Sequence, residues 1–221
     1  MGKGKPLLKD LPPNPVPEKV VDILEQAFIH HVGGEEYLAG VRMAVPGAGK
    51  LYGVKVPNLR KMADEIVRAY GKDNADLREM ALVCWDRGSR EYQLVALFIL
   101  AKINLEPVER WQLGERFLPD VENWESCDQL CWALLGRALA EDPGYMEVLE
   151  GWIGDGKFWV RRAALVAPVY LRGAKHTEEV ALDLDRRTLA ICKALLDDQE
   201  KYIRKAVDWS VREVIKRHYD V

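Results

Sequence analysis

Apolar and polar residues alternate with the period of an α-helix along most of this chain. After a proline-rich opening, the i, i+3, i+4, i+7 pattern predicts a helix from Glu18 to about His31, carried by Val20, Val21, Leu24, Ala27 and Phe28. The pair Gly33-Gly34 ends this helix, because glycine loses more backbone freedom in a helix than other residues do. A short helix is expected over 35–43. Pro57 fits a first helical turn and begins a helix that continues through Tyr70.

The rest of the chain keeps the helical period and shows no stretch with the two-residue period of a strand. The sequence therefore predicts an all-α fold. Because the loops are short, neighbouring helices should be antiparallel. The further helices are expected near 74–87, 91–103, 107–118, 124–140, 144–154, 157–171, 177–196 and 200–219.

Helical segments that start with an aromatic residue recur along the chain. They begin at Trp85, Trp124, Trp159 and Tyr202. The intervals between these starts are close to the roughly 40 to 47 residues of a HEAT or armadillo helix pair. Stacking explains the recurrence, because one helix pair cannot bury its apolar face alone. We expect a single HEAT-like or armadillo-like α-solenoid of antiparallel helix pairs over 18–221, with a concave groove, after a flexible Pro/Lys-rich arm over 1–17. An irregular helical bundle is the alternative.

Composition narrows the class of protein. Hydrophobic residues make up 48% and charged residues 30% of the 221 positions, as in ordinary soluble domains rather than disordered or fibrous chains. The longest uncharged apolar run, 92–101, is too short to cross a bilayer, and the N-terminus lacks the apolar run of a secretory signal. A cytoplasmic protein is expected. The cysteines form no C-x-x-C pair and the histidines are scattered, which predicts reduced thiols, no metal and no cofactor.

The most distinctive stretch is 123–132, in which Trp124 and Asp128 are four residues apart and would share one helix face. An indole favours burial and a carboxylate favours water. A face that carries both is therefore either a paired surface or a site built for a cation. The simpler alternative is that Asp128 is the N-cap of a helix and that Trp124 packs beneath it.

Basic residues accompany two further tryptophans. Trp159 has Arg162 three residues on, and Trp209 shares a helix face with Lys205 and Arg212. The net charge of -3 argues against a uniformly basic nucleic-acid binder, but the last predicted helix is locally basic. Such a run is most often a solvated face, although basic residues beside an aromatic ring also hold phosphates and bases.

Motifs for other chemistry are weak. The segment 47–50 (GAGK) is too short for a phosphate-binding loop, and no serine or cysteine lies in a recognisable nucleophile motif.

The chain resembles the AlkD-like DNA alkylation repair family, whose members are HEAT-repeat glycosylases that release N3- and N7-alkylated purines. The resemblance runs from about Leu51 to the C-terminus. It rests on the order and spacing of 53–60 (GVKVPNLR), 124–128 (WESCD), 159–162 (WVRR) and 209–213 (WSVRE).

This resemblance implies roles for individual residues. Asp128 would stabilise an oxocarbenium-like sugar between Trp124 and Trp209, and an arginine would hold the DNA backbone beside the lesion. Arg162 is favoured over Arg161 because Arg162 shares a helix face with Trp159. The residues expected to bind DNA are Arg162, Arg161, Trp159, Lys205, Arg204, Arg212, Lys55 and Arg60.

The chemistry agrees with these roles. An alkylated purine is already cationic, so its glycosidic bond is weakened and no general acid is needed; a carboxylate and indole faces then stabilise the sugar cation. The expected partner is duplex DNA that contains alkylated purines, bound by a monomer that associates with the nucleoid when on DNA. Which lesion is preferred stays open. The alternative is a non-catalytic HEAT-repeat protein that binds DNA, branched DNA included, or a protein partner.

Overall fold

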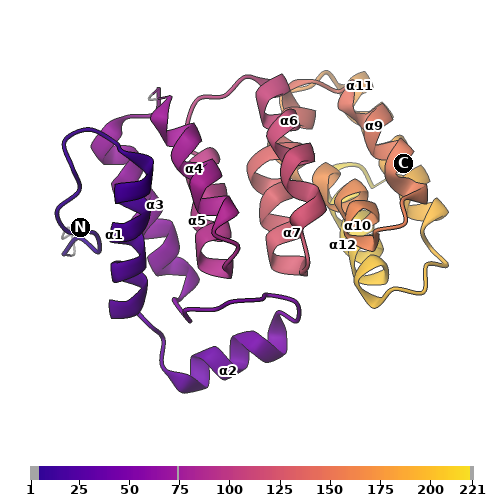
Figure 1. The fold of residues 1–221 in the computed structure, drawn as a ribbon. Helices are drawn as coiled ribbons and strands as arrows, with labels where there is room; N and C mark the ends of the chain where they lie inside the picture. Colours follow the sequence, from indigo (N-terminus) through magenta and orange to yellow (C-terminus); the bar gives the residue numbers. More distant parts are fainter. Residues whose placement is uncertain (1–4, 74, 220–221) are drawn as a thin grey trace. The chain divides into compact units, whose positions relative to one another are not determined.

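The computed structural model describes residues 5–73 and 75–219 of the chain, and these contain helices, loops and isolated β-bridges but no strand (Figure 1). The prediction of an all-α fold is confirmed. The chain divides into two compact units, Met1–Leu105 and Glu106–Val221. The single domain over 18–221 and the curved solenoid of helix pairs stay predictions. The expected helix start at Asn74 lies outside the described residues.

The first unit is built around one buried helix. Its helices are α1 (Pro17–His30), α2 (Glu35–Ala44), α3 (Val56–Tyr70), α4 (Asp76–Asp86) and α5 (Arg90–Leu100). α5 contacts both α3 and α4, and α1 packs against α4. Every residue of α5 except Gln93 is buried, which explains why this helix has no polar face in the sequence.

Glu91 fixes the loop that leads into α3. Its buried carboxylate accepts hydrogen bonds from the backbone N–H groups of 52–54 at 3.0 to 3.3 Å and pairs with Arg90 at 3.3 Å. Gly53 has a φ of 82°, and a Cβ there would lie 3.3 Å from the side chain of Leu38. Both the backbone conformation and the packing therefore require glycine in this loop.

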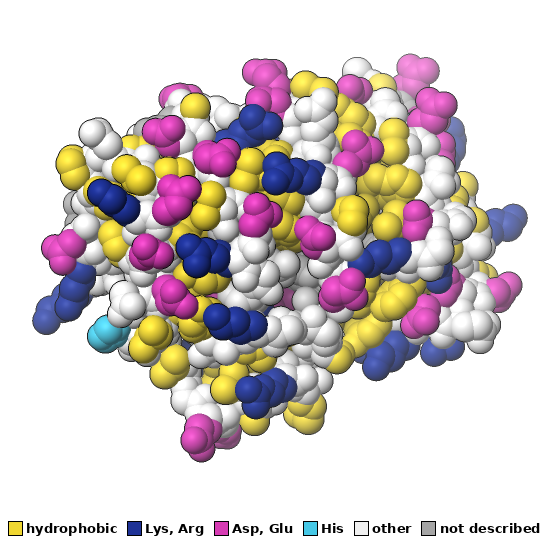
Figure 2. Space-filling view, in the orientation of Figure 1, with side chains coloured by type: hydrophobic (Ala, Val, Ile, Leu, Met, Phe, Trp, Pro, Cys, Tyr) yellow, Lys and Arg dark blue, Asp and Glu magenta, His cyan; other side chains and the backbone are white. Residues whose placement is uncertain are grey.

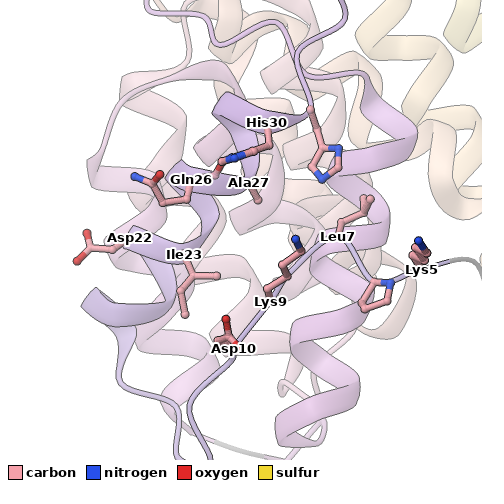
Figure 3. A pocket seen from close by; sticks show the side chains of 11 residues that line it. Lys5, Leu7, Lys9, Asp10, Asp22, Ile23, Gln26, Ala27 and His30 are labelled. Carbon is pink, nitrogen blue, oxygen red and sulfur yellow. The ribbon is translucent and has the colours of Figure 1, made fainter.

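The N-terminal arm lies against α1 and α3. Glu65 accepts hydrogen bonds from the backbone N–H groups of Leu7 and Leu8, and Tyr70 donates to the carbonyl of Pro12 at 3.0 Å. An open cavity of about 710 Å³ lies between the arm and α1 (Figure 3). None of the residues predicted to act on DNA lines this cavity. The flexibility of the arm stays a prediction.

The second unit is arranged around α10 (Phe158–Val166), which contacts helices from four other parts of the unit. These are α7 (Trp124–Leu130), α9 (Tyr145–Gly151), α11 (Glu178–Ala194) and α12 (Lys201–Arg217). The remaining segments are α6 (Pro107–Phe117), η1 (Leu118–Asp120), η2 (Cys131–Leu135), α8 (Gly136–Glu141), η3 (Trp152–Gly154) and η4 (Ala167–Gly173).

Two helices that the sequence predicts as continuous change their hydrogen bonding part of the way along. The helix expected over 124–140 is α-helical in α7 and α8 but π-helical in η2 between them. The helix expected over 157–171 is α-helical only to Val166 and continues as the 3₁₀ segment η4. Pro168 explains the second change, because proline has no N–H for the helical hydrogen bond and its ring clashes with the preceding turn.

Acidic and basic side chains are interspersed over the face drawn in Figure 2, in agreement with the small net charge of -3. No helix in the described part of the chain is both long enough and apolar enough to cross a membrane.

Candidate active site

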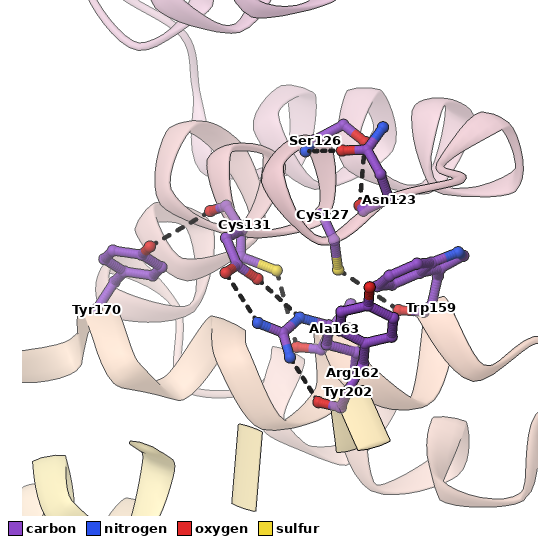
Figure 4. A network of polar contacts seen from close by, with 10 residues as sticks. Asn123, Ser126, Cys127, Cys131, Trp159, Arg162, Ala163, Tyr170 and Tyr202 are labelled. Atoms are coloured by element: carbon purple, nitrogen blue, oxygen red, sulfur yellow. Dashed lines mark hydrogen bonds and ion pairs between the residues drawn. The ribbon is translucent and has the colours of Figure 1, made fainter. Parts of the chain in front are cut away.

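Asp128 and Arg162 form a buried ion pair in the second unit. Asp128 on α7 is 8% exposed and Arg162 on α10 is 5% exposed. The Arg162 Nε donates to Asp128 Oδ1 and Nη2 donates to Oδ2, both at 2.9 Å (Figure 4). The remaining Nη1 donates to the backbone carbonyl of Tyr202 on α12 at 2.5 Å. One guanidinium therefore joins three helices and holds the carboxylate in a fixed orientation.

Burial and pairing act on Asp128 in opposite directions. Removal from water raises the pKa of the Asp128 carboxyl above its ordinary value of 3.8, and the hydrogen bonds and charge of Arg162 oppose this rise. Burial also lowers the pKa of Arg162, but Asp128 outweighs burial there and the net pKa of Arg162 is raised. The bidentate geometry requires an ionised carboxylate, so we treat the pair as charged at neutral pH.

Asn123, rather than Asp128, begins the helix. The Asn123 side chain accepts a hydrogen bond from the Ser126 N–H at 2.9 Å, and the Ser126 hydroxyl donates to the Asn123 carbonyl at 3.2 Å. Trp124 is the first residue of α7 and is half-buried. The interpretation of Asp128 as an N-cap is therefore wrong, and its carboxylate does not cap the helix.

The π-helical segment η2 begins at Cys131, three residues after Asp128. Gly136 N–H donates to the carbonyl of Cys131, five residues back, which is the π pattern. A Cβ on Gly136 would lie 2.7 Å from the carbonyl oxygen of Ala167 and 2.9 Å from the Tyr170 Cβ. Glycine therefore lets the helix approach η4 closely enough to place Tyr170 beside Asp128. Single π-turns inside α-helices occur frequently at functional sites.

Trp209 lies on α12 and is half-buried. Its ring meets the Tyr170 ring edge to face, with centroids 6.3 Å apart and an interplanar angle of 84°. The next residue, Ser210, donates a hydrogen bond from its hydroxyl to the carbonyl of Leu165 at 3.0 Å, which ties α12 to α10. Two of the three residues predicted to be catalytic, Asp128 and Trp209, thus contact a common neighbour.

The residues predicted to bind DNA through α10 have partners within the protein. The Trp159 ring is 4% exposed and packs against Phe158 and Tyr202, with centroids 4.4 Å and 5.1 Å away. It is part of the core in this structure. The Arg161 Nε donates to Asp198 at 2.8 Å. The phosphate contacts of Arg161 and Arg162 stay predictions.

The basic residues of α12 are exposed. Arg204, Lys205 and Arg212 all face solvent, and Arg212 pairs with Asp208 at 2.9 Å. Both side chains of this pair are exposed to solvent. The pair therefore adds little stability, and the Arg212 guanidinium stays accessible.

Lys55 and Arg60 belong to the first unit. The ammonium group of Lys55 lies 5.8 Å from the centre of the Tyr37 ring, and the Arg60 guanidinium lies 4.3 Å from that of Phe98. Both contacts are within reach of a cation–π interaction.

Two residues of the site were not predicted from the sequence. Tyr170 contacts both Asp128 and Trp209, and Tyr202 accepts from Arg162 and packs on Trp159. No spacing rule connects residues on different helices, so only the fold reveals these partners. In the described ranges, no group of three or more His, Cys, Asp or Glu side chains could hold a metal ion.

Comparison with known proteins bears on the whole second unit and most of the first. A family model described as DNA alkylation repair enzyme matches residues 30–221, which is most of the chain. A search of curated proteins found no match.

Proposed function

We propose that this chain, which belongs to the family of DNA alkylation repair enzymes, is a DNA glycosylase that releases cationic N3- and N7-alkylated purines from duplex DNA. In this proposal Asp128 stabilises the sugar cation that forms as the base departs. Trp124 and Trp209 flank the deoxyribose and lesion. The observation that carries the proposal is the buried, rigidly oriented carboxylate of Asp128.

The substrate supplies part of the chemistry. An N-alkylated purine carries a positive charge and leaves as a neutral base, so the protein need not protonate it. What remains is to stabilise positive charge on the sugar, and a fixed negative group does this best where water is excluded. Asp128 is such a group. Arg162 uses two of the roughly four lone-pair positions that a carboxylate offers, so capacity remains for the sugar or for a water molecule.

Binding is assigned to the basic residues around this site. Arg204, Lys205 and Arg212 would neutralise phosphates from α12, and Arg162 would add a contact beside the damaged nucleotide. Phosphate contacts fix the register of a protein on DNA without reading its sequence. This suits a repair enzyme, because a lesion can occur in any sequence.

Transfer of the alkyl group to a cysteine is a different repair chemistry, and the cysteines argue against it here. That reaction needs a thiolate. All four cysteines are buried. Burial raises the pKa of the Cys84 thiol to about 12 and also raises the pKa of Cys131 and Cys192. The thiols of Cys84, Cys131 and Cys192 remain protonated at neutral pH, which favours cleavage of the glycosidic bond.

The test is an assay of base release. Duplex that contains a single N7-methylguanine or N3-methyladenine is incubated with an excess of protein, and free base is measured against the same DNA without protein, because these lesions depurinate spontaneously. Release above that background is expected. Binding to the duplex without release would instead support the alternative, a non-catalytic DNA-binding protein.

A further inference from the structure

Tyr170 contacts both Asp128 and Trp209, two of the residues assigned to the proposed reaction. Its hydroxyl donates to the backbone carbonyl of Asp128 at 3.3 Å (Figure 4), and its ring and the Trp209 ring meet edge to face. The two residues that it contacts lie on α7 and α12, whereas Tyr170 lies on η4. A single side chain therefore spans two elements of the proposed site.

The contact with Asp128 falls where the helix changes its hydrogen bonding. At the end of α7, the Cys131 N–H is shared between the carbonyls of Cys127 and Asp128, and the π-turn begins there. A carbonyl oxygen has two lone pairs, so that of Asp128 can accept from the Tyr170 hydroxyl as well as from the Cys131 N–H. The Tyr170 hydroxyl thus fixes the backbone from which the Asp128 carboxylate projects.

The hydroxyl is a permanent donor. Burial, with nearby Cys131 and Asp128, raises the pKa of Tyr170 well above its ordinary value of 10.0. It stays protonated across the pH range of any enzyme assay, so its hydrogen bond does not titrate there. Tyr170 also packs closely against α8, because a Cβ on Gly136 would lie only 2.9 Å from the Tyr170 Cβ.

We propose that Tyr170 is a positioning residue for base excision, which holds the Asp128 backbone through its hydroxyl and the Trp209 indole through an edge-to-face contact of the two rings. This inference rests on the proposed glycosylase function. It assigns the two contacts separate effects. Loss of the hydroxyl should misplace the carboxylate, and loss of the ring should also release the indole.

Two variants separate these effects. Tyr170→Phe removes the hydroxyl but keeps the ring, and should slow single-turnover excision about 3- to 10-fold, the range that one hydrogen bond supports. Tyr170→Leu removes both interactions and should slow excision further. DNA affinity should change little in either variant. The pH dependence of excision should keep its shape, because Tyr170 transfers no proton.

Tyr70→Phe is the matched control. The Tyr70 hydroxyl also donates to a backbone carbonyl, that of Pro12, from a partly buried position in the first unit. It should excise at the parental rate. A second readout is the ¹⁹F resonance of Trp209 in protein labelled with 5-fluorotryptophan, assigned with Trp209→Phe. This resonance should move more in Tyr170→Leu than in Tyr170→Phe, because only the first variant removes the neighbouring ring.

The outcomes are distinct. If the parent releases base and Tyr170→Phe matches Tyr70→Phe, the positioning role is wrong while the glycosylase function stands. A loss of rate that equals the loss of DNA affinity, or that follows a fall in melting temperature, also overturns it, since a structural residue would give that result. If the parent releases no base, the proposed function fails and this role fails with it.

Discussion

At the scale of a single residue, Asp128 and Arg162 each need the other in order to be buried as a charge. Burial raises the pKa of Asp128, which means that the fold favours its neutral form. The carboxylate is kept ionised by Arg162 rather than by solvent. A functional charge that the fold disfavours is typical of an active site, although ion pairs with a purely structural role also shift pKa values.

Two substitutions break the pair from opposite sides. Asp128→Asn should slow excision by on the order of 100-fold or more, because it removes the charge directed at the sugar cation. It should also lower the free energy of unfolding, because it leaves the buried Arg162 guanidinium without a counter-charge, so excision is measured at a temperature where the variant is folded. Arg162→Gln leaves the Asp128 carboxylate buried without a counter-charge and should lower the free energy of unfolding by about 3 to 5 kcal/mol.

Thermal unfolding and single-turnover excision, measured on both variants, check this pair of expectations. An Asp128→Asn protein that excised at the parental rate would show that the carboxylate is only structural. Equal stability of Arg162→Gln and the parent would show that the pair does not hold the carboxylate in its charged state.

The pH dependence of excision follows from the same pKa. Asp128 must be ionised to act, and its folded-state pKa lies above 3.8. Excision should therefore fall, as the pH is lowered, at a pH above that ordinary value. The Asp128 contribution to stability is present below its unfolded-state pKa and lost as pH rises through the folded pKa, so protonation of this residue does not unfold the protein. Arg162→Gln should move the fall to higher pH.

A pH series of single-turnover rates, corrected for spontaneous depurination, tests this. Circular dichroism at each pH shows whether the protein stays folded. A rate that is constant down to about pH 4, near the pKa of an unperturbed aspartate, would contradict the expectation.

At the scale of the elements, periodicity predicted the helices but not how each ends. Apolar residues at helical spacing are a property of one segment, and they located the helical segments of the described chain, but not the changes to π and 3₁₀ hydrogen bonding inside two of them. The π-turn in η2 arises where Gly136 packs against Ala167, an approach between distant parts of the sequence. Pro168 is the one residue in these two helices whose chemistry indicates a change of hydrogen bonding from the sequence alone. Periodicity ignores it and predicts a helix to Leu171.

Gly136 tests the importance of that packing. Its backbone is helical, with φ of -69° and ψ of -28°, so alanine would be favoured there by helix propensity alone. Gly136→Ala should nevertheless lower the free energy of unfolding by about 1 to 3 kcal/mol, because its Cβ would meet two backbone carbonyl oxygens at 2.7 and 2.9 Å. Excision should slow as well, since η4 carries Tyr170.

Gly151→Ala is the matched control in the same unit. Its φ of -64° is also helical, and nothing lies within 4 Å of a Cβ there. Alanine should leave stability unchanged or raise it by up to about 1 kcal/mol. Thermal unfolding compares the two variants. If Gly136→Ala were as stable as Gly151→Ala, the close approach of α8 and η4 would not matter.

At the scale of the whole molecule, the sequence singled out candidate site residues but not their partners within the protein. It singled out Asp128 and Arg162, yet not their pairing across 34 residues, because helix-face rules act only within one helix. The same limit explains Trp159, which was expected at the DNA surface and is buried by Tyr202. The family match covers residues 30–221 and shows a DNA alkylation repair enzyme, while glycosylase activity and the roles of Asp128, Trp124 and Trp209 are proposals.

The net charge of -3 means that DNA binding must depend on a local basic surface. The exposed residues of α12 form one, and each phosphate that they neutralise releases counterions. A variant with Arg204→Ala, Lys205→Ala and Arg212→Ala should bind damaged and undamaged duplex more weakly by the same factor. The negative slope of log K against log salt concentration should become shallower by about 0.9 for each phosphate that is no longer neutralised. The slope of the triple variant should therefore be smaller in magnitude than that of the parent by about 1 to 3.

The control removes as much positive charge from elsewhere in the second unit. Lys175, Arg186 and Lys193 are exposed and lie in or next to α11. Their alanine triple variant has the same net charge as the α12 variant, so a general electrostatic effect would weaken both equally. Binding isotherms over a salt series distinguish the two. If both variants lost the same affinity and slope, DNA would respond to the total charge of the protein, and α12 would not be its binding surface.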